Sequence, residues 1–205
     1  MKNGRVWRKV LALHFEKKAA AEIMEQTRQN YMQLRESMEN DLDPILKKHL
    51  CTGLFPQIAL YKTLKQKGKN RKQAYALTQQ AHFESLKGMK RKYKWIGSLP
   101  FSFIYVRIVL PYVLRKNHPC TGWDIEWREN SKTCVSFFVH RCFYLDVLNK
   151  YDEGELIRIY CEGDDFLFQG TSPYIIWGRQ CTIPKGDRYC DTTFYKNNSK
   201  KMDNR

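Results

Sequence analysis

The chain has 205 residues and a formal net charge of +15, because 36 lysines and arginines outnumber 21 aspartates and glutamates. Hydrophobic residues make up 42% of the sequence and aromatic residues 14%, more than a disordered chain carries. The composition therefore excludes a disordered or low-complexity protein, and the length suits one substantial core.

Cysteine content and the lack of long apolar runs predict a cytoplasmic protein. The seven cysteines are expected to be free thiols, because an odd number cannot pair completely and charges interrupt residues 1–15 where a secretory signal would be continuous. The most apolar run, residues 101–114, contains Arg107 and Pro111 and is shorter than the roughly 20 residues that span a bilayer. We expect a buried core helix there and no membrane partner.

Residues 1–118 have the apolar spacing that is typical of helices. Asp43 before Pro44 predicts a helix start, since the carboxylate can accept hydrogen bonds from free backbone N–H groups and proline suits the first helical position. The predicted helices cover residues 1 to about 39, 44–50, about 52 to 66, 71 to about 92, and 101–114. This half is also the basic one, because residues 1–100 carry 21 lysines and arginines against 8 acidic residues.

From residue 119 onward, aromatic and β-branched residues predict strands. The predicted strands are 121–129, 132–141, 174–183 and 188–195, and two short helices, 143–149 and 154–161, lie between the second strand and the third. Gly186, in the turn between the last two strands, is expected to adopt a positive φ.

These elements predict an α+β fold, in which a helical N-terminal half packs with a C-terminal antiparallel sheet of about four strands. We expect a single domain over residues 1–195, with a helical part at 1–118 and an α+β part at 119–195. A polar tail follows at 196–205.

Several cysteines, acidic residues and an arginine recur in a fixed order in the C-terminal half. They are Cys142 at a predicted strand end, Cys161-x-x-Asp164, Arg179-x-x-Thr182, and Gly186-x-x-x-Cys190-Asp191-x-x-Phe194. This pattern resembles the signature of the L-2-amino-thiazoline-4-carboxylic acid hydrolase family. The resemblance implies a hydrolase that opens a C–N bond in a small cyclic amidine, such as 2-amino-thiazoline-4-carboxylate.

Such a reaction needs a nucleophile, a proton donor for the departing ring nitrogen and a cation for the substrate carboxylate. The candidate nucleophiles are Cys142 and Cys161, and the candidate proton donors are Asp164, Asp165 and Asp191. The candidate cations are Arg179 and Arg141. We predict Cys142 as the nucleophile, Asp164 and Asp191 as proton-transfer or orienting acids, and Arg179 as the substrate anchor.

Local charge separates the three motif cysteines. Cys142 follows His140 and Arg141 and opens a predicted helix, so cations and helix N–H groups should lower its pKa. Cys161 is expected at a helix end beside acidic residues that oppose ionisation of its thiol. Cys161 and Cys190 are therefore predicted to support the site without acting as the nucleophile. The alternative for all three is packing, because free cysteine usually behaves as a small buried hydrophobe. Asp191 could likewise serve only to hold a turn.

Zinc is the one cofactor for which the sequence contains possible ligands. Its ligands would come from Cys142, Cys161 and Cys190, together with His140 or an aspartate. The short-range spacings typical of zinc sites, Cys-x-x-Cys and His-x-x-x-His, do not occur. We therefore predict metal-free chemistry on a small-molecule substrate, without a cofactor.

Two other functions remain open from the sequence. A non-catalytic ligand-binding or sensor domain could keep the fold while its thiols only pack. A nucleic-acid-binding protein could use the cations around Tyr93 and Trp95, which are Lys87, Lys90, Arg91, Lys92 and Lys94. Because no nucleic-acid-binding motif accompanies these cations, we do not expect that partner. The sequence predicts no particular oligomeric state.

Overall fold

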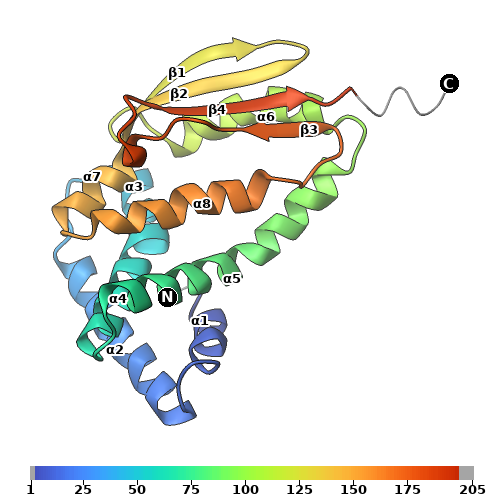
Figure 1. Cartoon of the computed structure of the whole chain (residues 1–205). Coiled ribbons are helices and arrows are strands. Elements are labelled where there is room, and N and C mark those ends of the chain that lie inside the picture. The colour runs from blue at the N-terminus through green and yellow to red at the C-terminus, as the bar shows by residue number, and fades with distance from the viewer. Residues whose placement is uncertain (1–2, 199–205) are drawn as a thin grey trace. The chain divides into compact units, whose positions relative to one another are not determined.

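The computed structural model describes residues 3–198 and has the predicted α+β fold (Figure 1). Its N-terminal elements are α1 (Gly4–Leu11), α2 (Lys17–Glu36), α3 (Pro44–His49), a π-helical turn (Leu50–Leu54), α4 (Phe55–Gln66), α5 (Arg71–Gly97) and α6 (Ser102–Asn117). Its C-terminal elements are β1 (Trp123–Asn130), β2 (Cys134–Cys142), α7 (Phe143–Lys150), α8 (Ile157–Phe168), β3 (Ile175–Gly178) and β4 (Cys190–Lys196).

The chain forms two compact units, and helices α5, α7 and α8 contribute residues to both. The first unit contains the chain up to Lys87 together with Leu148–Ile159, and the second contains Gly88–Val147 and the chain from Tyr160 onward. The single domain predicted for residues 1–195 stays a prediction. Most of the predicted tail, residues 199–205, lies outside the described residues.

The first unit is built around α2 and the almost wholly buried α4. The sequence predicted one unbroken helix up to about residue 39, and this was wrong, because the chain leaves the helix between Leu11 and Lys17. The break lets α1 bury Trp7, and the Trp7 indole Nε1 donates a hydrogen bond to Ser85 Oγ at 2.9 Å. Burial of this apolar face stabilises the turn over a straight continuation.

Local helix signals elsewhere in the first unit were predicted correctly. The Asp43 carboxylate accepts hydrogen bonds from the backbone N–H groups of Ile45 and Leu46, at 2.7 and 3.3 Å, and Pro44 is the first helical residue. Helix α5 starts at Arg71 as expected, but it continues to Gly97, beyond the predicted end near residue 92.

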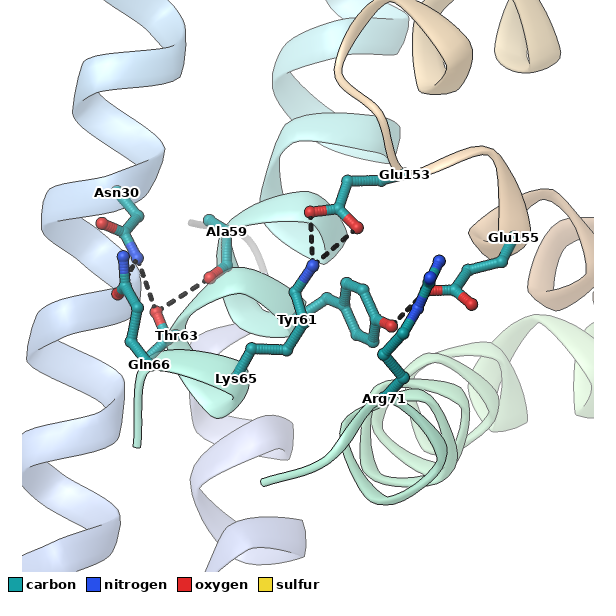
Figure 2. A network of polar contacts seen from close by, with 9 residues as sticks. All are labelled: Asn30, Ala59, Tyr61, Thr63, Lys65, Gln66, Arg71, Glu153 and Glu155. Carbon is teal, nitrogen blue, oxygen red and sulfur yellow. Dashed lines mark hydrogen bonds and ion pairs between the residues drawn. The ribbon is translucent and has the colours of Figure 1, made fainter. Parts of the chain in front are cut away.

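A polar network fastens the turn between α7 and α8 to α4 and α5 (Figure 2). Lys65 Nζ contacts both carboxylate oxygens of Glu153, at 2.8 and 2.9 Å, and the Glu153 side chain is only 4% exposed. The Tyr61 hydroxyl donates to Glu155, which also pairs with Arg71 at 3.2 Å. Burial and the Glu155 carboxylate raise the pKa of Tyr61 to about 12, so Tyr61 remains a neutral donor.

Replacing Lys65 with methionine is expected to lower the free energy of unfolding by about 2 kcal/mol, because it leaves a nearly buried carboxylate without its cation. Urea denaturation followed by circular dichroism measures the change. The control is Lys67→Met, which removes an exposed pair with Glu22 at 3.8 Å and should cost at most about 0.5 kcal/mol. Equal losses in the two variants would contradict a special role for the Lys65–Glu153 pair.

The second unit contains the sheet, whose strand order is β1-β2-β4-β3 with every neighbour antiparallel. The predicted hairpin of β1 and β2 is confirmed. Helix α6 covers one face of this sheet, where Phe103 joins Val135, Phe137 and Phe194 in a core cluster (Figure 1). Period-two alternation sends the intervening side chains of each strand to the opposite face.

The last two strands are shorter than predicted. Strand β3 ends at Gly178, and the chain up to Cys190 is irregular apart from a 3₁₀ turn at Ile183–Lys185. The positive φ expected for Gly186 is confirmed, at 97°. A loop of this length returns the chain so that β4 lies between β2 and β3.

Helix α8 differs most from expectation, since it was predicted to end at Cys161 and instead runs to Phe168. Leu167 is buried and the Phe168 ring stacks on Trp177, with ring centroids 4.8 Å apart. Burial of these apolar side chains favours helix through the acidic stretch at 162–165. Cys161 therefore lies within the helix and not at its C-terminal end.

No helix between residues 3 and 198 combines the length and apolarity that crossing a bilayer requires.

Candidate functional site

The motif residues meet at one end of the sheet in the second unit. Strand β2 ends at Cys142, and β4 begins at Cys190, which pairs with Val139 of β2. Helix α8 carries Cys161, Asp164 and Asp165, whose spacing of three and four residues places them on one helix face. Three elements that are distant in sequence thus bring thiols and carboxylates together.

Arg179 is the centre of this cluster. Its side chain is only 8% exposed, and the guanidinium contacts Asp164 Oδ2 at 3.3 Å and Asp165 Oδ1 at 2.9 Å. Nη2 also donates to the carbonyl oxygen of Cys161, and the guanidinium lies 5.6 Å from the centre of the Trp177 ring. The Trp177 indole in turn donates to Asp165 at 2.9 Å. Arg179 therefore fixes α8 to the end of β3.

This geometry changes the role expected of Arg179. A guanidinium that already binds two carboxylates and a carbonyl has much of its donor capacity occupied. Its observed contacts make it an organiser of the acidic residues, while its role as the substrate anchor stays a prediction.

The Cys142 thiol lies at the start of α7, as predicted, but its pKa does not follow the expectation. Burial raises the pKa of Cys142 to about 11, although the backbone N–H groups of Leu145 and Tyr144 at the helix N-terminus act against this rise. The cations expected to assist are engaged elsewhere, since Arg141 pairs with Asp146 at 2.9 Å. Desolvation outweighs the helix terminus, so Cys142 is an unionised thiol at neutral pH.

The other two motif thiols share this environment. Burial raises the pKa of Cys161 to about 12 against the opposing effect of Arg179, and Asp164 adds to the rise. Burial also raises the pKa of Cys190, whose sulfur accepts a hydrogen bond from the backbone N–H of Ile183 at 3.3 Å. Cys190 raises the pKa of both Cys142 and Cys161, and Cys142 raises that of Cys161, which places the three thiols in one electrostatic neighbourhood.

Asp164 is the carboxylate whose properties are most altered. Burial raises its pKa to about 6, although the ion pair with Arg179 acts in the opposite direction. Solvent still reaches 53% of its side chain, so the carboxylate is crowded by protein but not sealed from water. An acid with this pKa is partly protonated near neutral pH and can donate a proton.

Three predicted site residues have other partners. Asp191 accepts backbone hydrogen bonds from Gln180 at 2.8 Å and Cys181 at 2.6 Å, so it holds the loop after β3. His140 contacts Glu126 at 2.9 Å, and Arg141 is engaged by Asp146. The turn-holding alternative describes the observed contacts of Asp191, and its part in proton transfer stays a prediction.

The site also contains two tyrosines that the sequence analysis did not predict. Tyr144 and Tyr160 pack edge to face with ring centroids 5.0 Å apart, and burial raises the pKa of both phenols. Cys142 and Asp164 contribute to the raised pKa of Tyr144, which places its hydroxyl in the same electrostatic neighbourhood as the motif thiols. The available signal was that each tyrosine lies within two residues of a motif cysteine.

The zinc alternative gains no support from the part of the chain that the structure describes. Residues 3–198 contain no group of three or more histidine, cysteine, aspartate and glutamate side chains placed to hold a metal ion.

The fold and this cluster define an α+β protein with a thiol, carboxylate and guanidinium site at the end of its antiparallel sheet. The sequence model of the L-2-amino-thiazoline-4-carboxylic acid hydrolase family matches residues 47–194, more than half of the chain. The chain therefore belongs to this family, which confirms the resemblance seen in its motif. No individual curated protein matches it.

Proposed function

We propose that this protein hydrolyses a C–N bond of a small cyclic amidine such as 2-amino-thiazoline-4-carboxylate. Family membership supports the reaction class. The observation that carries the proposal is the meeting of Cys142, Cys161 and Asp164 at one end of the sheet, because it supplies a nucleophile beside a carboxyl group able to donate a proton.

The protonation states suggest how the reaction proceeds. The neutral Cys142 thiol transfers its proton to the basic ring nitrogen while its sulfur adds to the carbon between nitrogen and sulfur. The ring C–N bond then breaks, and the leaving nitrogen takes a second proton from Asp164. Water adds to the same carbon and returns a proton to Asp164, after which the carbonyl forms and Cys142 leaves as a thiol. The net change is the addition of one water.

Turnover by the purified, reduced protein tests this proposal. We expect the amino-thiazoline carboxylate to be converted to an open-chain product that is one water heavier, as measured by mass spectrometry. Because only the protonated Asp164 donates, kcat/KM should fall as pH rises above about 6. Asp164→Asn should remove this limb of the pH profile together with most of the activity, and an unchanged profile would contradict the assignment.

A non-catalytic ligand-binding domain is the second candidate, and one observation favours it. All three motif thiols have raised pKa values, as buried structural cysteines do. Calorimetric binding of the substrate without any turnover, at every pH and with metal content checked on the same sample, would support this candidate over the hydrolase.

A further inference from the structure

A long stretch in the middle of the chain contains cations and no acidic residue. Between Glu84 and Asp124 there is no aspartate or glutamate. The same stretch contains eight lysines and arginines, which are Lys87, Lys90, Arg91, Lys92, Lys94, Arg107, Arg115 and Lys116. This segment is therefore a concentrated source of the chain's positive charge.

Exposed apolar side chains gather in the same segment. Among the described residues, eight of the thirteen large hydrophobic side chains that are exposed fall within it. They are Met89, Trp95, Phe101, Ile104, Tyr105, Ile108, Tyr112 and Val113. Exposed apolar and cationic side chains thus occur in the same segment, which belongs to the second unit from Gly88 onward, and the catalytic proposal uses none of these residues.

Helix α6 shows how this surface is organised. Its inner face packs Phe103, Val106 and Leu110 into the sheet core. An outer stripe begins at Phe101, directly before the helix, and continues on the opposite face of α6 with Ile104, Tyr105, Ile108 and Tyr112. Exposed Arg115 and Lys116 lie at the C-terminal end of the helix. The helix is apolar on both sides; among residues 3–198, its inner side packs against the sheet and its outer side is exposed.

We propose that the outer stripe of α6 binds the surface of a membrane that contains anionic lipid. Aromatic and branched aliphatic side chains beside lysine and arginine form the composition that enters the headgroup boundary, where cations meet lipid phosphates. The helix lies on such a surface and does not cross it. The expectation of no membrane partner rested on the lack of a spanning segment, which this arrangement does not need.

Two other occupants fit the surface less well. A second copy would bring the same acid-free, cationic segment against itself, and this like-charge contact would oppose association. Nucleic acid would satisfy the cations and could stack on Tyr105 or Tyr112, but it offers no partner for Ile104 and Ile108. An anionic membrane satisfies both the charge and the aliphatic side chains. This inference does not depend on the reaction proposed above.

Vesicle co-sedimentation of the full chain tests the inference. We expect binding to vesicles of phosphatidylcholine with about 30% phosphatidylglycerol, weaker binding at high salt, and little binding to phosphatidylcholine alone. Ile108→Glu alters a side chain that is 64% exposed and should weaken binding at least about tenfold. Arg115→Glu should weaken it at least about fivefold.

The matched control is Ile176→Glu, a side chain that is 50% exposed on β3. Its neighbours Ile175 and Trp177 pack in the core cluster, so Ile176 points to the sheet face opposite α6, and its replacement should leave vesicle binding unchanged. Circular dichroism checks that each variant is folded, and Tyr112→Glu repeats the test at a second stripe position.

Three results would overturn the inference. The first is equal vesicle binding by Ile108→Glu, Tyr112→Glu and the parent protein. The second is binding to a single-stranded oligonucleotide with no binding to anionic vesicles, which would assign the surface to nucleic acid. The third is a dimer in light scattering that Ile108→Glu dissociates while the parent does not bind vesicles, which would assign the stripe to self-association.

Discussion

Replacing Cys142 with serine is expected to lower kcat/KM for amino-thiazoline carboxylate by at least about a hundredfold. A hydroxyl gives up its proton far less readily than a thiol, even one whose pKa is raised to about 11. The change is small in volume, and the backbone N–H groups of Tyr144 and Leu145 can still meet an oxygen there. Substrate binding should therefore persist, and the loss should lie in kcat.

Matched controls for this prediction come from the other cysteines. Cys161→Ser and Cys190→Ser alter thiols in the same neighbourhood, and Cys120→Ser alters an exposed thiol outside the motif. We expect Cys120→Ser to keep full activity, and the two motif variants to keep more activity than Cys142→Ser. Full turnover by Cys142→Ser would rule out the nucleophile, and the largest loss at Cys161 would transfer that role to it.

Replacing Arg179 with methionine is expected to have the largest effect on stability. The side chain is nearly buried, and the substitution leaves Asp164, Asp165 and the Cys161 carbonyl without their shared donor. Because both carboxylates are partly hydrated, we expect a loss of about 3 kcal/mol in the free energy of unfolding and not the larger loss of a fully buried pair. Urea denaturation measures this loss.

The same variant has a second expected consequence, at Asp164. Arg179 acts to lower the pKa of this carboxyl group, so its removal should move the pKa of Asp164 further upward.

Arg179→Lys should restore only part of the stability that Arg179→Met loses, because one ammonium cannot contact both carboxylates and the carbonyl as the forked guanidinium does. Arg188→Met alters an exposed arginine of the same loop and serves as the control. Similar losses for Arg179→Met and Arg188→Met would contradict the organising role.

The sequence predicted those parts of the fold that local chemistry decides. The Asp43 side chain caps a helix within three residues of itself, and the β1–β2 hairpin follows from strand composition on both sides of a short turn. The order and spacing of the motif cysteines and Asp164 are properties of the chain alone, and the family resemblance based on them is confirmed by the family match.

Long-range burial decided the rest. Helix α8 extends past Cys161 because Leu167 and Phe168 pack in the second unit, and sequence spacing does not show what those side chains will meet. The α1–α2 break depends in the same way on the burial of Trp7.

Charge and protonation at the site also depend on contacts between residues distant in sequence. Neighbours in sequence predicted a lowered pKa for Cys142, but burial raises it. Arg179, predicted as the substrate anchor, pairs with Asp164 and Asp165, which lie about 15 residues earlier in the chain. The sequence by itself determined the α+β class, the family and the residues from which a site could be built. Only the tertiary structure decided which of them meet and how they are protonated, because desolvation and ion pairing depend on distances in space and not on positions along the chain.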